Sequence, residues 1–118
     1  MKIKQALIAL GALAQETRLA AFRHLVVAGP KGISAGALAS ALKIAAPTLS
    51  FHLKELERAG LIAQRRQSRS IIYTANYSAM RGVLSFLMED CCAGNPDICK
   101  YITKEPGHEP PAHSPARA

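Results

Sequence analysis

The stretch from Ala46 to Arg69 constrains the fold of this chain most, because it couples an amphipathic helix to an extended segment rich in arginine. A stripe of leucines recurs there at helical spacing and predicts one buried face, with polar side chains on the opposite face. The stripe consists of Leu49, Leu53 and Leu56. Pro47 suits a first helical turn, where its missing N–H costs no hydrogen bond, and Gly60 favours the helix end. We therefore predict a helix that begins near Pro47 and ends just before Gly60.

The segment after this helix has the pattern of a β-hairpin. Ile71–Thr74 is rich in β-branched and aromatic residues, and Leu61–Ile62 opens an extended run before it. Between the two, Gln64–Ser70 is entirely polar. We expect two strands joined by a basic tip that carries Arg65, Arg66 and Arg69.

Two helical patterns open the chain. The apolar residues of the first are Ile3, Leu7, Leu10 and Ala14. Those of the second are Leu19, Phe22 and Val26. Glu16 begins the second pattern, where the helix dipole favours a carboxylate, and Gly29–Pro30 ends it. The apolar side of the first helix needs a partner.

A third helix is predicted directly before the leucine-striped one. Ser34 is a good N-cap for it, and Leu38 and Leu42 are its apolar residues. Only Lys43–Ala45 then separates it from the helix that begins near Pro47. Two short helices joined this closely indicate a helix-turn-helix.

A long apolar stripe predicts a last helix after the hairpin. Its residues are Met80, Val83, Leu84, Leu87 and Met88. The pattern continues to Cys92, and Gly94–Pro96 breaks it. From residue 105 onward the chain is rich in proline and poor in apolar residues, so we expect a disordered tail there.

Together these elements predict a mainly α fold with a β-hairpin, in the order ααααββα of a winged helix-turn-helix. We expect one domain over residues 1–92, followed by an extension over residues 93–118 that carries Cys99. The net charge of +7 points to an anionic partner, and nucleic acid is the first candidate. No apolar run of membrane-spanning length and no secretory leader is visible, so we expect a cytoplasmic protein without a membrane partner.

Three stretches of the chain match a known pattern, between about Leu10 and about Leu87. They are LAQETRLAAFRHL, TLSFHLKELERAGLI and SRSIIYTAN. In these residues the chain resembles the ArsR/SmtB family of metalloregulatory repressors, and the spacing of Ser50, His52 and Leu53 is the most specific part. The resemblance implies a homodimer with the first and last helices at its interface. It also implies that the dimer blocks transcription on double-stranded operator DNA until an inducer lowers its affinity.

The residues themselves predict DNA contacts from the helix and from the hairpin. A major groove admits an α-helix, and short polar side chains can reach phosphates or base edges. Arginines on a hairpin suit backbone phosphates. The predicted contacts are Pro47, Thr48, Ser50, His52, Lys54, Arg65, Arg66 and Arg69. The alternative is structural: a half-buried histidine and a solvated arginine tip.

The cysteines predict a site for a soft ion. The family's usual arsenic-sensing pair of thiols belongs in the first helix of the helix-turn-helix, but Ala35–Ala39 contains no cysteine. Cys91 and Cys92 instead follow the apolar stripe of the last helix, and Cys99 is near enough in sequence to join them. Three thiolates suit trivalent arsenic or antimony, whereas zinc usually takes four ligands. The alternative is that these cysteines are small buried apolar residues.

Other functions are less well supported by the sequence. A small thiol-dependent arsenate reductase would need an activated thiol, yet Glu89 and Asp90 precede the cysteines and disfavour thiolate. The chain also lacks a Cys-x-x-Cys motif and a phosphate-binding glycine loop. We therefore predict no enzymatic activity. A zinc- or redox-responsive repressor, or a constitutive DNA-binding protein of the same fold, remains as an alternative.

Overall fold

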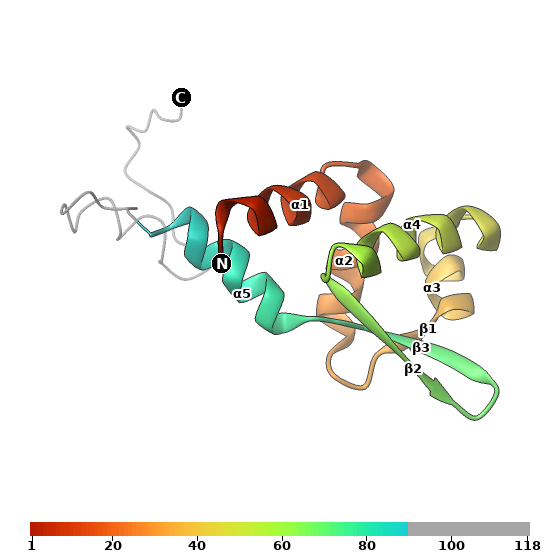
Figure 1. Cartoon of the computed structure of the whole chain (residues 1–118). Coiled ribbons are helices and arrows are strands. Elements are labelled where there is room, and N and C mark those ends of the chain that lie inside the picture. The colour runs from red at the N-terminus through yellow and green to blue at the C-terminus, as the bar shows by residue number, and fades with distance from the viewer. Residues whose placement is uncertain (90–118) are drawn as a thin grey trace, which may run out of the picture. The chain divides into compact units, whose positions relative to one another are not determined.

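Five helices and three short strands make up the part of the chain that the structure, a computed structural model, describes: residues 1–89 (Figure 1). They are α1 (Ile3–Leu13), α2 (Glu16–Ala28), β1 (Ile33–Ser34), α3 (Ala35–Leu42), α4 (Ala46–Arg58), β2 (Ile62–Gln67), β3 (Ser70–Ala75) and α5 (Tyr77–Leu87). The predicted winged helix-turn-helix is confirmed. The residues from Met1 to Phe86 form one compact unit.

The core lies where α2, α3 and α4 meet the base of the hairpin (Figure 1). The predicted leucine stripe of α4 is buried, as are Leu25 and Leu38 from the two helices beneath it. Because one face of α4 is anchored in this core, its opposite face is exposed to solvent. The largest fully buried side chains are Leu25, Leu38, Leu49, Leu53, Leu56 and Leu61.

Local hydrogen bonds set the turn between α3 and α4. The Ser34 hydroxyl accepts from the Ala37 N–H at 3.1 Å, which confirms the predicted N-cap. At the other end of α3, Lys43 takes a left-handed conformation with φ 58°, and the Ile44 N–H donates to the Ala39 carbonyl at 3.1 Å. This closed helix end turns the chain directly into α4.

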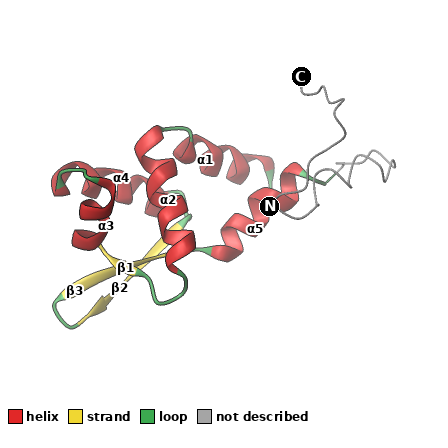
Figure 2. Cartoon of the chain, turned by 180° about the vertical axis from the view of Figure 1, so that it is seen from behind, coloured by secondary structure: helices red, strands yellow, loops and turns green. Residues whose placement is uncertain are grey.

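The hairpin belongs to a small antiparallel sheet with the order β1-β3-β2 (Figure 2). Strand β1 was not predicted, because a strand of two residues carries no periodicity. Gly32, directly before β1, has φ +75°, and a Cβ there would lie 2.5 Å from the Tyr73 carbonyl oxygen. The close approach of β1 to β3 therefore requires a glycine at this position.

The hairpin loop is shorter than predicted. Gln67 pairs with Ser70, so Ser68 and Arg69 alone form the loop, and Ser68 takes a left-handed φ of 57°. The prediction that all three arginines lie at the tip is therefore wrong, since Arg65 and Arg66 belong to β2. Neighbouring strand residues point to opposite faces, and an edge strand such as β2 tolerates such polar residues.

In α1 the fully buried residues are small. The helix buries Ala6 and Ala9, whose small side chains allow a close approach to the core, while Ile3 and Leu7 are 64% and 63% exposed. Leu19 of α2 is also exposed, although the sequence placed it in the apolar stripe of that helix. Leu10 and Leu13 pack against the core, whereas Ile3, Leu7 and Ile8 stay exposed in the described part of the chain.

The last helix ends earlier than predicted. We expected α5 to continue to Cys92, but it ends at Leu87, and Met88 and Glu89 form a turn. Acidic residues follow, and negative charge at a helix C-terminus opposes the helix dipole. Cys91, Cys92 and Cys99, the predicted disordered tail and the predicted domain boundary all lie outside the described residues. Within residues 1–89, no helix is both long and apolar enough to cross a membrane.

Candidate nucleic-acid interface

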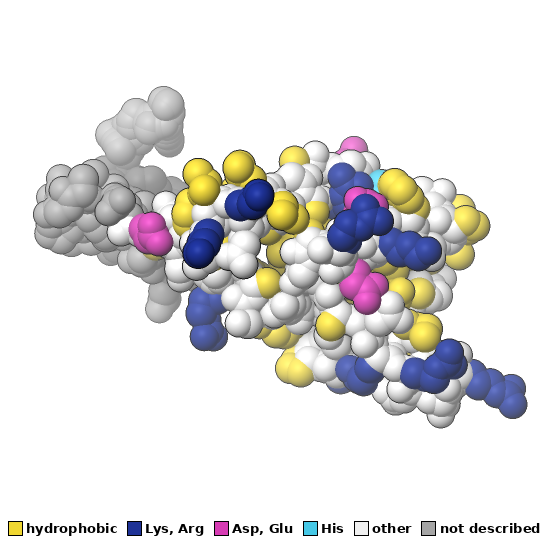
Figure 3. All heavy atoms as spheres, viewed as in Figure 1, with side chains coloured by type: hydrophobic (Ala, Val, Ile, Leu, Met, Phe, Trp, Pro, Cys, Tyr) yellow, Lys and Arg dark blue, Asp and Glu magenta, His cyan; other side chains and the backbone are white. Residues whose placement is uncertain are grey.

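The exposed face of α4 carries four of the eight residues predicted to contact DNA. Pro47, Thr48, Ser50 and Lys54 are all exposed on this helix. Figure 3 shows lysine and arginine side chains over α4 and along the hairpin as far as its tip. A polar helix face next to a basic hairpin is the arrangement that a DNA groove and its flanking phosphates can accept.

His52 lies at the edge of this face and is half-buried. Its Nδ1 is 3.2 Å from Nη1 of Arg18 in α2, and the Arg18 Nε donates to the Ala12 carbonyl at 2.6 Å. A guanidinium group can only donate, so Nδ1 of His52 accepts and the ring hydrogen is on Nε2. Arg18 thus links the end of α1 to α4, and it leaves His52 one donor nitrogen for a further partner.

Phe51 is a further residue of this face and was not among the predicted DNA contacts. Its side chain is 58% exposed, and its ring meets the His52 ring edge-on with centroids 5.3 Å apart and planes inclined by 69°. Its position between the leucines of α4 would have placed it on the exposed face, and that signal was available in the sequence. Arg18 had no such signal, because it is 34 residues from His52.

Glu57 attaches the hairpin to α4. Both of its carboxylate oxygens accept from Nε2 of Gln64 in β2, at 2.9 and 3.0 Å. Burial, and after it the charge of Glu57, raises the pKa of Tyr73, which pairs with Gln64 across the hairpin. Glu57 therefore contacts β2 through a hydrogen bond to Gln64 and influences Tyr73 of β3 through its charge. It is one of the contacts between α4 and the hairpin.

The arginines of the hairpin differ in their surroundings. Arg65 donates through Nη2 to the Lys31 carbonyl at 2.7 Å, so it holds the turn that precedes β1. Arg66 on β2 and Arg69 in the loop are exposed, as Arg65 is, so the difference lies in the hydrogen bond of Arg65. Arg58, near the end of α4, pairs with Glu55 at 3.3 Å and remains largely exposed. Arg66 and Arg69 are thus better placed for phosphates than Arg65.

The predicted metal site cannot be placed on this unit. Residues 1–89 contain no group of three or more histidine, cysteine or acidic side chains arranged to hold a metal ion. The three cysteines follow this range, so the predicted thiol site stays a prediction.

The sequence is similar to known helix-turn-helix regulators. Residues 13–65 match a family model described as a helix-turn-helix domain. The transcriptional activator HlyU of Vibrio cholerae is 30% identical over 91 residues, which cover 77% of this chain and 82% of HlyU. YceK of Bacillus subtilis, an uncharacterized HTH-type transcriptional regulator, is 44% identical over 59 residues, which cover 50% of this chain and 58% of YceK.

Solved structures agree with this assignment. HlyU from Vibrio cholerae superposes with a TM-score of 0.61 at 29% identity, over 75% of this chain and 94% of HlyU. An ArsR-like transcriptional regulator from Rhodococcus shares the fold with a TM-score of 0.68 at 23% identity, over 87% of this chain and 96% of that one. A homodimeric winged helix-turn-helix DNA-binding domain from Mycobacterium bovis shares it with a TM-score of 0.59 at 22% identity, over 91% and 90%. The chain therefore belongs to the family of helix-turn-helix transcriptional regulators that includes HlyU, and it has the winged helix-turn-helix fold of ArsR-like regulators.

Proposed function

We propose that this protein is a homodimeric transcriptional repressor that binds operator DNA through α4 and the hairpin. The observation that carries the proposal is the exposed polar face of α4, fixed by a leucine stripe on one side and joined by Glu57 to a hairpin with exposed arginines. In a symmetric dimer two such helices can enter successive major grooves, about 34 Å apart. The hairpins then lie along the flanking phosphates and contribute affinity.

The surface of α1 supports the dimer. Ile3, Leu7 and Ile8 are large apolar side chains exposed on one helix, which is costly unless another surface covers them. Leu84 of α5 is exposed as well. The homodimeric neighbour from Mycobacterium bovis has the same fold, and a second copy of this chain is the partner we propose for these helices.

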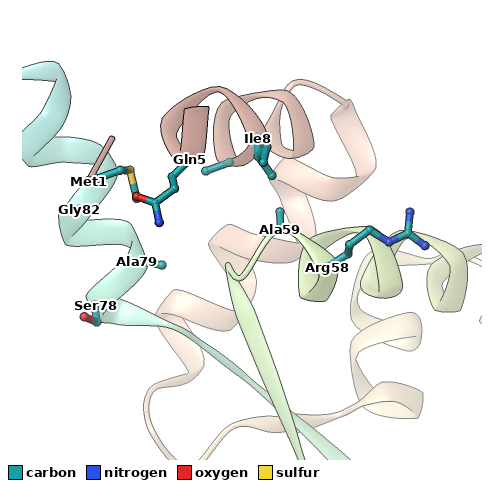
Figure 4. A pocket seen from close by; sticks show the side chains of 9 residues that line it. Met1, Gln5, Ile8, Arg58, Ala59, Ser78, Ala79 and Gly82 are labelled. Atoms are coloured by element: carbon teal, nitrogen blue, oxygen red, sulfur yellow. The ribbon is translucent and has the colours of Figure 1, made fainter. Parts of the chain in front are cut away.

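Two open cavities lie beside the same helices. One, of about 450 Å³, is bordered by α1, the end of α4 and α5, with Met1, which precedes α1, and Gln5 of α1 pointing toward Gly82 of α5 (Figure 4). The other, of about 220 Å³, has an apolar lining that includes Leu13, Leu19 and Leu84. The side chains of a second subunit can fill such hollows at a dimer interface.

Electrophoretic mobility shifts test the DNA-binding proposal directly. We expect the full chain to bind a duplex from its own promoter region more tightly than a scrambled duplex of equal length. The double variant Thr48→Ala with Ser50→Ala should lose this preference and keep its salt-dependent binding to any duplex. Equal affinity of the native chain for both duplexes would rule out operator recognition.

For the inducer we propose trivalent arsenic or antimony, bound by the thiols of Cys91, Cys92 and Cys99. The support is chemical, since three thiols suit a soft ion that takes three sulfur ligands. A coupling of about 1–3 kcal/mol between ion and operator is typical of such regulators. Arsenite should therefore weaken operator binding by the native chain, and Cys99→Ser should require a higher concentration. Unchanged operator affinity at saturating arsenite would refute the proposed inducer while leaving DNA binding intact.

A zinc- or redox-responsive regulator is the alternative, and it is tested in the same titrations. Zinc or a mild oxidant replaces arsenite, and whichever agent shifts operator affinity identifies the signal. HlyU is named an activator, so the sign of regulation also needs a measurement. A promoter fused to a reporter gene should be repressed by the native chain and relieved by arsenite, whereas activation by the chain would contradict repression.

A further inference from the structure

Phe51 lies in the middle of the face that α4 exposes. Thr48 is one turn before it and Lys54 one turn after it, both exposed, and both are predicted DNA contacts. An aromatic side chain that is 58% exposed between such polar neighbours gains nothing from the protein core. Its position therefore calls for an explanation outside the fold.

The other large apolar side chains that are exposed lie on α1, α2 and α5. These are Met1, Ile3, Leu7, Ile8, Leu19, Val27, Leu84 and Leu87. Within residues 1–89, Phe51 alone belongs to the helix-turn-helix and hairpin face. It lies on neither α1 nor α5, the helices that we assign to the second subunit, and its contact belongs to the DNA side of the protein.

The ring of Phe51 packs against the ring of His52. Its edge-on contact with His52, at 5.3 Å between centroids, rests on a histidine whose Nδ1 accepts from Arg18. Arg18 in turn is fixed by the Ala12 carbonyl. A ring supported in this way loses less conformational entropy on binding than a free one, which suits a residue that has to meet one chemical group at a defined place.

The major groove offers one apolar group on its base edges, the C5 methyl of thymine. Phenylalanine is among the residues that contact it favourably, together with alanine and the methyl group of threonine. Resting on the proposed operator binding, we propose that Phe51 is a specificity-determining residue that contacts the C5 methyl of a thymine in each half-site. Thr48, Ser50 and His52 then supply polar contacts around it, and the operator requires thymine at the position opposite Phe51.

The test removes only the methyl group. Sites are first selected from a random duplex library with the full native chain, and each thymine of the enriched site is then replaced by deoxyuridine, which preserves base pairing. Loss of the one methyl carbon that would be buried lowers the affinity by about fourfold. We expect one thymine in each half-site at which uracil lowers the affinity of the native chain by about fourfold.

Variants assign that effect to the side chain. Phe51→Ala should bind the thymine and uracil duplexes equally, and Phe51→Leu should retain part of the difference because it keeps an apolar group. Val27→Ala is the matched control, since Val27 is an exposed apolar residue of α2 that is 86% exposed and distant in sequence from α4. This variant should respond to uracil as the native chain does.

The outcomes separate this inference from the proposed function. If the native chain enriches no site, operator recognition itself fails. If a site is enriched but no uracil substitution weakens binding, or if Phe51→Ala keeps the fourfold loss at the same thymine, the assignment of Phe51 is overturned. Should Phe51→Ala prove unfolded by circular dichroism, Phe51→Leu and the measurement on the native chain still decide between these results.

Discussion

At the scale of single residues, the pair of Arg18 and His52 joins two parts of the protein that are far apart in sequence. The guanidinium group donates to the Ala12 carbonyl and to the imidazole of His52, and both bonds are partly buried. Removal of a partly buried hydrogen bond costs more stability than removal of an exposed one, because it leaves a desolvated polar group without a partner. Arg18 therefore contributes to the position of α4 without facing the groove itself.

Arg18→Met keeps an apolar stem of similar length and removes both hydrogen bonds. We expect it to lower the free energy of unfolding by about 1–3 kcal/mol, measured by urea denaturation. Arg23→Met in the same helix is the control, because Arg23 is exposed and should change stability by less than about 0.5 kcal/mol. Equal stability of the two variants would mean that the Arg18 bonds contribute nothing net.

Gly32 is the second residue whose role depends on a tertiary contact, here the close approach of β1 to β3. Its φ is +75°, and the methyl carbon of an alanine there would lie 2.5 Å from the Tyr73 carbonyl oxygen. Gly32→Ala should therefore lower the free energy of unfolding by about 1–3 kcal/mol in thermal or urea denaturation. Gly36→Ala in α3 is the matched control, since nothing lies within 4 Å of its added Cβ, and that change should be neutral or slightly stabilising. A native-like stability of Gly32→Ala would show that β1 can move away from β3.

At the scale of secondary-structure elements, the hairpin gives two neighbouring arginines different surroundings. Arg65 bonds to the backbone at Lys31, and Arg66 is exposed on the next position of the same strand. The strand alternates its side chains between two faces, so adjacent identical residues acquire different surroundings. From sequence alone they were equivalent members of a basic cluster.

Arg66→Ala should weaken DNA binding uniformly across sequences and lower the salt slope of log K by about 1 for each phosphate that the protein no longer neutralises. Arg69→Ala should behave in the same way. Arg65→Ala is the matched comparison, and we expect it to lower protein stability with a smaller change in the salt slope. Fluorescence anisotropy between about 50 and 200 mM salt, the range over which such interactions weaken strongly, measures the slopes. An unchanged slope for Arg66→Ala would exclude a phosphate partner there.

At the scale of the whole molecule, the exposed apolar side of α1 determines the expected assembly. Leu7→Lys places a charge in the proposed interface and removes a buried leucine worth about 1.5 kcal/mol or more from each of two subunits. The dimer should therefore dissociate at a concentration at least about 100-fold higher, as measured by sedimentation equilibrium. Val27→Lys is the control and should leave the dimer intact. A native-like dissociation constant for Leu7→Lys would place the interface elsewhere.

Local chemistry was enough to predict the helices and the hairpin. The leucine spacing of α4, the Ser34 cap and the glycine after α4 act within a few residues, so the sequence shows them directly. The same local spacing predicted which face of α4 is polar, and with it most of the candidate DNA contacts. The net charge led to the prediction of a nucleic-acid partner, and the cysteines led to the proposed inducer. Both inferences use properties of the side chains that do not depend on their place in the fold.

Contacts between distant residues decided the rest. The Arg18 bond to His52, the fit of Gly32 against β3 and the bond from Arg65 to Lys31 each join residues far apart in the chain, and no local spacing encodes them. The full burial of Ala6 and Ala9, with Ile3 and Leu7 left exposed, was decided in the same way, because close helix packing favours alanine at the buried positions. Local patterns specify elements, whereas the faces that those elements bury and expose depend on the surfaces that the fold brings against them.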